Sequence, residues 1–336
     1  MPGQKQPILL TIVIVSYNTP KLVIECLNSI IFEVEGADLL GHKTEIIVID
    51  NHSSDDSVKQ IDQFLASLTS SAVKVILVKN NQNSGFAKAN NQALKNASGE
   101  YFLLLNSDTL MRPGSLVNLV SNLIWAKTHS RIGLLAGDLK NPDGSKQHQG
   151  GALPNLWTLK THMLMLSKIP LLNKFLSSTQ NEAKIKLRKL SSPRGQLQIQ
   201  GWVGGAALII PKEIYLHCGP LDENIFMYGE DTEYCLRARK AGFLCAIDLS
   251  APITHLAFAS SSSSQALIGE MTGLLYIFKK HHPAWQLPIA YMLLLMGCYL
   301  RICLFSLSAS GQTKVETYKQ AVSQLKKRYN TATAKS

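Results

Sequence analysis

Paired cysteine motifs are missing from this 336-residue sequence: its 6 cysteines form no C-x-x-C pair, and none lies at zinc-ligand spacing from a histidine. That absence argues against a structural zinc site and indicates small buried side chains in a reducing compartment. A G-x-G-x-x-G sequence is also missing after the first predicted strand, so a dinucleotide site of the Rossmann type lacks its fingerprint. A bias toward disorder is absent too, because hydrophobic residues make up 46% of the chain and support a substantial core.

Acidic residues are scarce: 23 stand against 34 basic residues, which gives a net charge of +11. Such an excess calls for an acidic partner, and the candidates are a nucleoside diphosphate, a nucleic acid or an anionic membrane surface. The excess is concentrated in residues 181–195 and beyond Gln312. Neither run interleaves aromatic residues with its charges, which argues against stacking on single-stranded nucleic acid. We therefore expect no nucleic-acid partner.

Short apolar runs alternate with helical patterns through the first part of the chain. Strands are predicted at Thr11–Val15, Glu45–Asp50, Val73–Val78 and Tyr101–Leu105, and helices from Pro20 to about Ile31, after Ser57 to about Leu68, and from Gly85 onward. The first run lacks a small-residue cleavage site, which favours a buried strand over a signal peptide. This alternation predicts an α/β fold with a mostly parallel sheet, and ligands of such sheets bind beyond the carboxyl ends of the strands.

Polar residues directly follow two of these predicted strands. Asn106–Asp108 comes after the apolar run that ends at Leu105, and Asp50 ends the second strand. The Asp108 carboxylate is a hard oxygen ligand that suits Mg²⁺ or Mn²⁺, and a cation there can hold a diphosphate. Asp50 could accept a hydrogen bond from a pyrimidine N3–H beside a stacking Tyr17. The structural alternative is that Asp50 caps the following helix.

Another acidic pair lies in the sequence FMYGEDTEYCLRARKAGF, which starts at Phe226. Glu230 and Asp231 open a predicted helix over Thr232–Ala241, where the helix dipole and capping favour carboxylates for structural reasons alone. The same position keeps a carboxylate ionised, so that it can act as a general base toward an acceptor hydroxyl. His255 follows a short apolar stretch. A single histidine in such a place is more often a surface or core residue, with its hydrogen bonds made inside the protein, than a ligand.

Two further segments contain no predicted catalytic or metal-binding residue. We expect Trp157–Gly195 to begin as a helix and to continue as a mobile loop or lid, because it turns basic and contains serine and proline. Ile199–Pro211 is predicted as a strand region. Its Gly204 and Gly205 allow a close approach of the backbone, either to packing neighbours or to a ligand.

Beyond Ser260 the pattern changes to long helices. Apolar residues at helical spacing predict an amphipathic helix through Leu267, Met271, Leu274, Leu275 and Phe278. The stretch from Pro283 to Leu300 is uncharged and sits at the lower edge of a membrane span, but Pro288 and Arg301 weaken that interpretation. We expect a helix in the membrane interface, with a basic tail at 313–336 on anionic headgroups. A hairpin packed on the domain or on a second subunit is the alternative.

Several ordered blocks at natural spacing resemble the bacterial family 2 glycosyltransferases, and they look closest to the rhamnosyltransferase-like branch. The blocks are TIVIVSYN, IIVIDNHSSDDS, NSGFAKANN, YFLLLNSD, NPDGS, WVGGAALIIP and FMYGEDTEYCLRARKAGF. The resemblance covers about Pro7 to Ser260. It implies a GT-A fold over residues 7–260, an inverting mechanism that depends on Mg²⁺ or Mn²⁺, and a nucleoside-diphosphate-sugar donor. Residues 261–312 would form appended hydrophobic helices.

Carried over residue by residue, the resemblance implies that Tyr17 and Asp50 hold the nucleobase. Gly85 and Asn91 lie in a block that borders the nucleotide. Asn106 stands beside the nucleotide where many relatives have aspartate, a departure that leaves the metal fewer charged ligands.

The resemblance also assigns the reacting groups. Asp108 matches the second acid of the D-x-D motif, and His255 matches a histidine that can ligate the metal or touch the diphosphate. Asp231 matches the catalytic base, with Glu230 beside it. The Q-x-x-R-W motif of processive synthases is absent, which favours the addition of one sugar, or few, to each acceptor.

The sequence therefore predicts a non-processive glycosyltransferase of cell-surface polysaccharide synthesis, at the cytoplasmic face of the cell membrane. From the overall resemblance alone, the expected donor is dTDP-rhamnose, with UDP-linked sugars left open, and the expected acceptor is a glycan or a lipid-linked glycan. A sugar nucleotidyltransferase is the first alternative, but such enzymes usually open with a glycine-rich basic loop, unlike Ser16-Tyr17-Asn18. A membrane-associated binder without catalysis is the second, and the intact acidic residues count against it.

Overall fold

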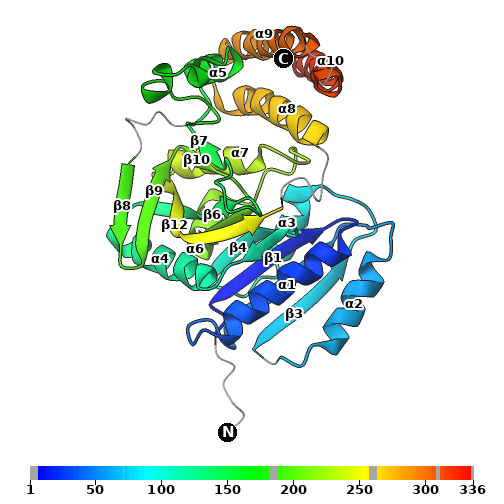
Figure 1. Ribbon diagram of the computed structural model, residues 1–336, viewed down its shortest axis with the longest axis vertical. Helices are drawn as coiled ribbons and strands as arrows, with labels where there is room; N and C mark the ends of the chain where they lie inside the picture. Colours follow the sequence, from blue (N-terminus) through cyan, green and yellow to red (C-terminus); the bar gives the residue numbers. More distant parts are fainter. Residues whose placement is uncertain (1–6, 71, 182–187, 257–262, 308–310, 334–336) are drawn as a thin grey trace.

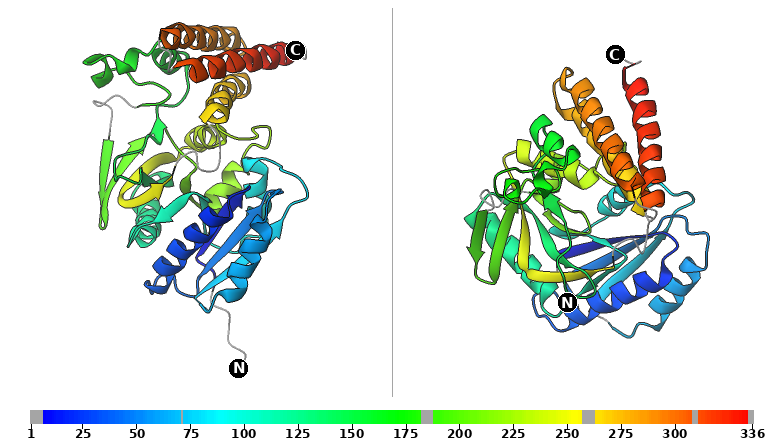
Figure 2. Two further views of the ribbon diagram at one scale, coloured as in Figure 1. Left: turned by 45° about the vertical axis from the view of Figure 1, so that its right-hand side comes forward. Right: turned by 45° about the horizontal axis from the view of Figure 1, so that its top comes forward.

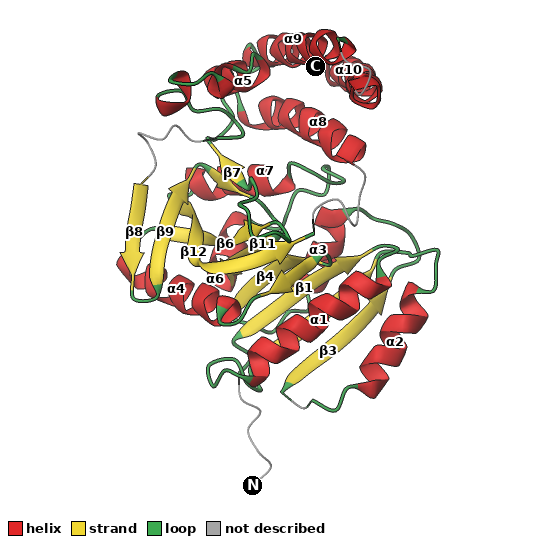
Figure 3. Ribbon diagram, viewed as in Figure 1, coloured by secondary structure: helices red, strands yellow, loops and turns green. Residues whose placement is uncertain are grey.

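The computed structural model describes residues 7–70, 72–181, 188–256, 263–307 and 311–333. A central β-sheet carries helices on both faces, and a bundle of helices stacks on one end of this α/β unit (Figures 1 and 3). The strand order is β3-β2-β1-β4-β11-β6-β12-β9-β8, with β5 paired to β12. Apart from β11 and β9, the strands along this path run in the same direction. The predicted α/β fold with a mostly parallel sheet is confirmed.

The parallel half of the sheet gathers the predicted strand ends at one edge. It consists of β1 (Leu10–Ser16), β2 (Thr44–Asp50), β3 (Val73–Lys79) and β4 (Tyr101–Asn106). Ser16 is in register with Asp50, and Val15 is in register with Asn106. The side chains of β1, β2 and β4 are almost all buried, because helices cover both faces of a sheet of this kind.

The other half of the sheet brings a second set of residues to the same edge. It consists of β11 (Ala207–Pro211), β6 (Ile132–Lys140), β12 (Leu244–His255), β9 (Gly195–Gln200), β8 (Arg188–Ser192) and the short β5 (Thr109–Met111). β11 runs antiparallel to both β4 and β6. β5 pairs with the end of β12, with His255 opposite Thr109, which places His255 beside Asp108.

Helices on the two faces of the sheet enclose two separate cores. One face packs against α1 (Pro20–Glu35), α2 (Ser57–Ser67) and α4 (Ser115–His129), and the other against α3 (Phe86–Leu94), α6 (Lys212–Cys218) and α7 (Glu230–Lys240). α1 starts at the predicted Pro20 but extends beyond the predicted Ile31. The reason is that Ile31 and Val34 are also buried, so the apolar face continues for another turn.

A third core lies inside the helical bundle at the end of the molecule (Figure 2). The bundle comprises α5 (Leu156–Met163), α8 (Ser263–His281), α9 (Gln286–Ser306) and α10 (Gln312–Thr333). The predicted amphipathic helix beyond Ser260 is therefore present as α8. The segment that we expected as a basic tail forms α10, whose Tyr318, Val322 and Leu325 are buried in the bundle core.

Two further segments differ from the sequence-based expectation. Trp157–Gly195 begins as helix α5 and contains the turns η1 (Leu166–Lys168) and η2 (Leu172–Lys174), but its basic end forms strand β8, paired with β9. The part of the expected lid at 182–187 lies outside the described residues. Ile199–Pro211 is not one strand: β10 (Trp202–Val203) pairs with β7 (Gly150–Gly151), and Gly204 and Gly205 separate β10 from β11.

By length and composition alone, α9 could cross a membrane, with a mean hydropathy of 1.8. One polar residue ties this helix to the bundle. Arg301 is buried and donates hydrogen bonds to the carbonyl oxygens of Met163 (2.8 Å), His162 (3.0 Å) and Gly297 (3.0 Å). Because Met163 and His162 belong to α5, Arg301 donates to carbonyl groups in the last turn of that helix, where intrahelical donors run out. The His162 carbonyl also accepts from the Met165 amide (3.0 Å).

Candidate active site

A cavity of about 1020 Å³ opens at the carboxyl edge of the sheet, between the strand ends and helix α8. Six of the nine residues predicted for the site line it: Tyr17, Asn106, Asp108, Glu230, Asp231 and His255. They come from segments as far apart as β1 and β12, so the fold assembles a single site from the predicted residues. Asp50, Gly85 and Asn91 do not line the cavity.

Asp50 is buried at the end of β2 and binds the turn that follows it. Its carboxylate accepts hydrogen bonds from the Ser53 hydroxyl (2.6 Å) and the Ser53 amide (3.1 Å). Because α2 starts only at Ser57, Asp50 caps no helix, and that structural alternative is wrong. Tyr17, directly after β1, keeps 42% of its surface exposed on the cavity wall, so its ring is available for stacking.

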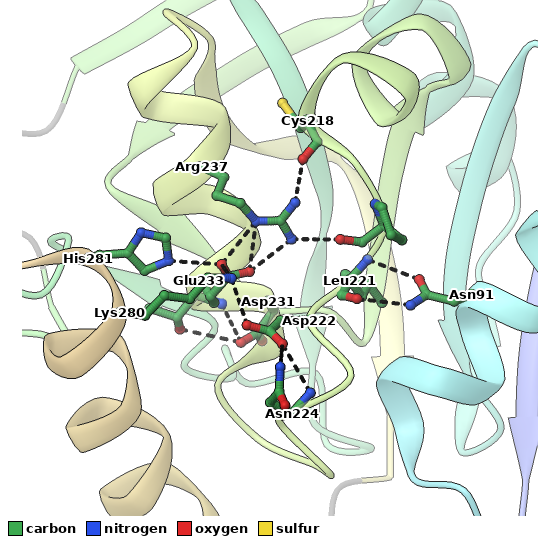
Figure 4. Close-up of polar contacts among 12 residues, drawn as sticks. Asn91, Cys218, Leu221, Asp222, Asn224, Asp231, Glu233, Arg237, Lys280 and His281 are labelled. Atoms are coloured by element: carbon green, nitrogen blue, oxygen red, sulfur yellow. Dashed lines mark hydrogen bonds and ion pairs between the residues drawn. The ribbon is translucent and has the colours of Figure 1, made fainter. Parts of the chain in front are cut away.

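Gly85 and Asn91 support a wall of the cavity without facing it. Gly85 has a φ of +82°, and a Cβ there would lie 2.6 Å from the Phe226 carbonyl oxygen. The Asn91 side chain donates to the Leu221 carbonyl (2.9 Å) and accepts from the Leu221 amide (2.9 Å), as Figure 4 shows. Both residues thereby hold the loop before α7, which carries the cavity-lining residues Phe226 to Tyr228.

Asp108 and His255 form the corner of the cavity where a cation fits. Asp108 Oδ1 lies 3.3 Å from His255 Nε2. Two ligands that each sit about 2.1 Å from an octahedral Mg²⁺ or Mn²⁺ are about 3 Å apart, so these two atoms match neighbouring coordination positions. No cluster of three His, Cys, Asp or Glu side chains suitable for a metal occurs in the part of the chain that the structure describes. A cation here would therefore need further oxygen ligands from the donor or from water.

Gln147 orients the His255 ring, and nothing in the local sequence singled it out. Its Nε2 donates to the His255 carbonyl oxygen (2.6 Å), which leaves its Oε1 facing His255 Nδ1 at 2.8 Å. An acceptor at that position requires Nδ1 to carry the proton. In the neutral ring, Nε2 then presents its lone pair toward Asp108, as metal ligation requires.

The Gln147→Ala variant should therefore bind Mn²⁺ more weakly in the presence of a nucleoside diphosphate. We expect the affinity to fall by roughly 10- to 100-fold, the usual effect of removing a residue that orients a metal-ligating histidine. Titration of free Mn²⁺ by electron paramagnetic resonance measures this directly, without reference to turnover. Gln63→Ala, on the exposed surface of α2, is the matched control. Equal Mn²⁺ affinity in both variants would remove Gln147 from the metal corner.

Glu230 and Asp231 lie at the start of α7, on a different part of the cavity wall from the metal corner. Asp231 accepts hydrogen bonds from the amides of Gly205 (3.0 Å) and Thr232 (2.6 Å). Burial raises the pKa of Asp231, while these amides act in the opposite direction and favour its ionised form. The close approach expected at Gly204-Gly205 is thus one to the Asp231 carboxylate.

Glu230 carries the proton of this pair at neutral pH. Burial, followed by the adjacent charge of Asp231, raises the pKa of Glu230 to about 8. Its Oε2 receives no hydrogen bond from the residues that the structure describes. The hydrogen-bond donors of Asp231, the amides of Gly205 and Thr232, favour the ionised form of that carboxyl group.

A buried ion network fixes α7, and with it both carboxylates (Figure 4). Glu233 is fully buried and accepts hydrogen bonds from Arg237 Nε (2.9 Å), Lys280 Nζ (2.7 Å) and His281 Nε2 (2.8 Å). Lys280 and His281 belong to α8. The network therefore clamps the helix that carries Asp231 to the helix that forms the opposite wall of the cavity.

Residues 11–169 match the family model described as "Glycosyl transferase family 2". The matched region is a little under half of the chain, which is thus similar to this family over that region. The chain is 24% identical over 197 residues to an N-acetylglucosaminyl-diphospho-decaprenol L-rhamnosyltransferase of Mycobacterium tuberculosis, and the alignment covers 58% of this chain and 60% of that protein. A second relative is the UDP-Glc:alpha-D-GlcNAc-diphosphoundecaprenol beta-1,3-glucosyltransferase WfaP of Escherichia coli, 37% identical over 30% of this chain and 35% of its own length. The chain thus spans less than two thirds of the length of each of these relatives.

Solved glycosyltransferase structures share the fold of this chain. The mannosyltransferase PcManGT of Pyrobaculum calidifontis, in complex with GDP-Man and Mn²⁺, superposes with a TM-score of 0.54 at 15% identity and covers 97% of this chain and 85% of its own. GalNAc-T7 with UDP, GalNAc and Mn²⁺ gives a TM-score of 0.56, at 15% identity, over 82% of this chain and 48% of its own. The predicted GT-A fold is confirmed.

Proposed function

We propose that this chain is a family 2, inverting glycosyltransferase that moves one sugar from a nucleoside-diphosphate sugar to a hydroxyl group of a glycan or lipid-linked glycan. One observation carries the proposal. A single cavity holds a pair of metal-compatible ligands, Asp108 and His255, and a separate carboxylate, Asp231, which accepts hydrogen bonds from two backbone amides. A diphosphate leaving group needs the first feature, and an acceptor hydroxyl needs the second.

Asp231 is the general base of the proposed reaction. Its carboxylate takes the proton of the acceptor hydroxyl as that oxygen attacks the anomeric carbon, and the bond from the sugar to the diphosphate breaks on the opposite side. One displacement of this kind inverts the anomeric centre. The amides of Gly205 and Thr232 hold the Asp231 carboxylate in place before the reaction, so no reorganisation is needed at that moment.

At the other end of the donor, Asp108 and His255 would hold a divalent cation. Such a cation, when bound, supplies positive charge that stabilises a diphosphate leaving group. Tyr17, half exposed on the cavity wall, would stack on the nucleobase. Asp50 would act at the nucleobase as well, once its turn opens toward the cavity, because its carboxylate is now engaged with Ser53.

The donor and the acceptor are inferred from the relatives. Rhamnosyl transfer is named for the Mycobacterium tuberculosis protein, which supports dTDP-rhamnose as the first donor to test. UDP-glucose is named for the Escherichia coli protein, which keeps UDP-sugars on the panel. Both names specify a sugar on a polyprenyl diphosphate, so a lipid-linked acceptor at the cytoplasmic membrane face, in cell-surface polysaccharide synthesis, is the matching proposal.

The exposed face of α9 supports this membrane location. Its bundle side holds Leu294, Cys298 and Arg301, while apolar side chains on the other side are exposed: Met292, Met296, Tyr299, Leu300 and Leu304. Residues 169–175, after α5 at the same end of the molecule, expose Leu171 and Phe175 as well (Figure 1). Because Arg301 ties α9 to α5, we propose that α9 lies along the membrane surface and does not cross it.

The double variant M292E/M296E should accordingly lose membrane binding. Two charges on the exposed face of α9 would have to enter the headgroup region, and we expect at least about a tenfold drop in the fraction that floats with vesicles of phosphatidylglycerol and phosphatidylcholine. Leu216→Glu, which charges an equally exposed leucine on α6, is the control. If the double variant still floats like the control, α9 is not the membrane contact.

Donor hydrolysis by the purified protein tests the proposed activity. A panel of dTDP- and UDP-sugars would be incubated with Mg²⁺, Mn²⁺ or EDTA, and the released nucleotide would be measured. Release of one nucleotide that stops with EDTA is the expected result. A protein that binds nucleoside diphosphates but releases nothing from any donor, even with a lipid extract added, would instead be a binder without catalysis.

A further inference from the structure

A second cavity, of about 440 Å³, lies on the far side of Asp231 from the metal corner. Asp231, Trp202, Tyr228 and His148 line both cavities, so the base stands at the boundary between them. Asp108 and His255 line only the main cavity. A diphosphate held at the metal corner therefore lies in the main cavity. The second cavity remains available for a different part of the substrates.

The lining of the second cavity combines an aromatic ring with hydrogen-bonding groups. The Trp202 indole is fixed because its Nε1 donates to the Thr179 carbonyl oxygen (2.7 Å). Glu270, on α8, accepts a hydrogen bond from Gln180 Nε2 and keeps 33% of its side-chain surface exposed. A pyranose ring offers an apolar face, which packs on an indole, and hydroxyl groups, which donate to carboxylate and amide oxygens.

The wall that α8 contributes is rigid. A Cβ on Gly273 would lie 2.7 Å from the Tyr228 carbonyl oxygen, so this helix contacts the loop before α7 without intervening side chains. Lys280 and His281 bind Glu233 of α7 further along the same helix (Figure 4). Glu270 is thereby held at a fixed position relative to Asp231.

We propose that the second cavity binds a sugar ring of the acceptor, with Trp202 as the stacking surface and Glu270 as the acceptor of its hydroxyl hydrogen bonds. A ring seated there presents a hydroxyl group to Asp231 from the side opposite the donor. This proposal rests on the glycosyltransferase function above and deepens it, because it assigns acceptor recognition to α8 of the helical bundle. The chemistry recognised is an uncharged sugar ring adjacent to the attacking hydroxyl.

The variants Glu270→Gln and Trp202→Phe test whether the second cavity binds the acceptor sugar or only supports the active site as a whole. The probe is transfer of radiolabelled sugar from the hydrolysable donor into a membrane fraction of the source organism, which contains the natural acceptor whatever its structure. Donor hydrolysis without membranes is measured in parallel. We expect incorporation to fall at least about tenfold in both variants. Hydrolysis and Mn²⁺-dependent nucleotide binding should stay within about twofold of the wild-type values in Glu270→Gln, because Glu270, unlike Trp202, lines only the second cavity. Glu316→Gln, on the exposed side of α10, is the matched control.

Three results would contradict the proposal. Unchanged incorporation in both variants removes the second cavity from acceptor binding. A parallel fall of incorporation and hydrolysis in Glu270→Gln shows that this variant damages the site as a whole, and thermal unfolding would show the same loss. Hydrolysis by the wild type without any incorporation refutes a membrane-borne acceptor. If the wild type neither hydrolyses nor transfers, the glycosyltransferase proposal itself fails, and the two failures are thus distinguished.

Discussion

Asp231→Asn is expected to lower the rate of sugar transfer by roughly 1000-fold, while nucleotide affinity stays within about twofold of the wild-type value. Removal of a positioned general base typically costs 10²- to 10⁴-fold. The amide side chain keeps the shape of aspartate but cannot accept the hydroxyl proton. Single-turnover transfer and a separate titration of nucleoside diphosphate measure the two quantities. Asp62→Asn, at an exposed aspartate on α2, is the control for the substitution itself.

The Glu230→Gln variant tests whether Glu230, and not Asp231, is the general base. Because the raised pKa of Glu230, about 8, keeps this group protonated at pH 7, a neutral glutamine resembles it there. Transfer at pH 7 should stay within several-fold of the wild-type rate. A loss as large as that of Asp231→Asn would mean that Glu230 is the base.

The pH profile follows from the same pair. Above about pH 8, Glu230 loses its proton and adds a negative charge to the cavity that must bind an anionic diphosphate, so kcat/KM of the wild type should fall. Glu230→Gln removes this ionisation and should remove the alkaline fall with it. A wild-type kcat/KM that is flat from pH 7 to pH 9.5 would contradict the assigned protonation.

The parts of this site that could be predicted are the ones that local sequence encodes. A buried strand that ends in polar residues, as at Asn106–Asp108, is visible in sequence because its apolar run and its tip are adjacent. Gln147 could not be found in this way. It meets His255 across 108 positions, and only the pairing of β6 with β12 brings the two together. Gly205 is an intermediate case. The sequence predicted a close approach of the backbone there, but it did not identify Asp231 as the contacting residue.

Two basic segments were predicted to lack regular structure because of their charge, but one forms a strand and the other a helix. The basic run at Arg188–Ser192 was assigned to a loop, although charged residues are common on edge strands such as β8, where they discourage pairing with other chains. In α10, the apolar Val315, Tyr318, Val322 and Leu325 already follow helical spacing beneath the basic residues. The bundle that buries them could not be foreseen, because its partners α5 and α9 are distant in sequence or were assigned to the membrane.

Asp108→Ala should abolish metal-dependent turnover, since Asp108 is the one acidic residue at the metal corner and Asn106 offers no charge beside it. We expect the Mn²⁺ affinity of the nucleotide complex to fall by at least about 100-fold and donor hydrolysis to reach the level measured in EDTA. His255→Ala should weaken Mn²⁺ in the same direction but less, because it removes a neutral ligand and leaves the carboxylate. Asp38→Ala, at an exposed position after α1, controls for loss of acidic charge alone.

The test depends on the relative size of the loss of Mn²⁺ affinity in the three variants. If the metal is held mainly by charge, Asp108→Ala must exceed His255→Ala, and Gln147→Ala must resemble a weaker His255→Ala because it acts through that ring. If all three variants bind Mn²⁺ like the wild type yet lose activity, the corner at Asp108 serves the sugar and not a cation. The positive charge that the leaving diphosphate needs would then have to come from basic side chains of the cavity, of which Lys146 and Arg328 are the candidates on its wall.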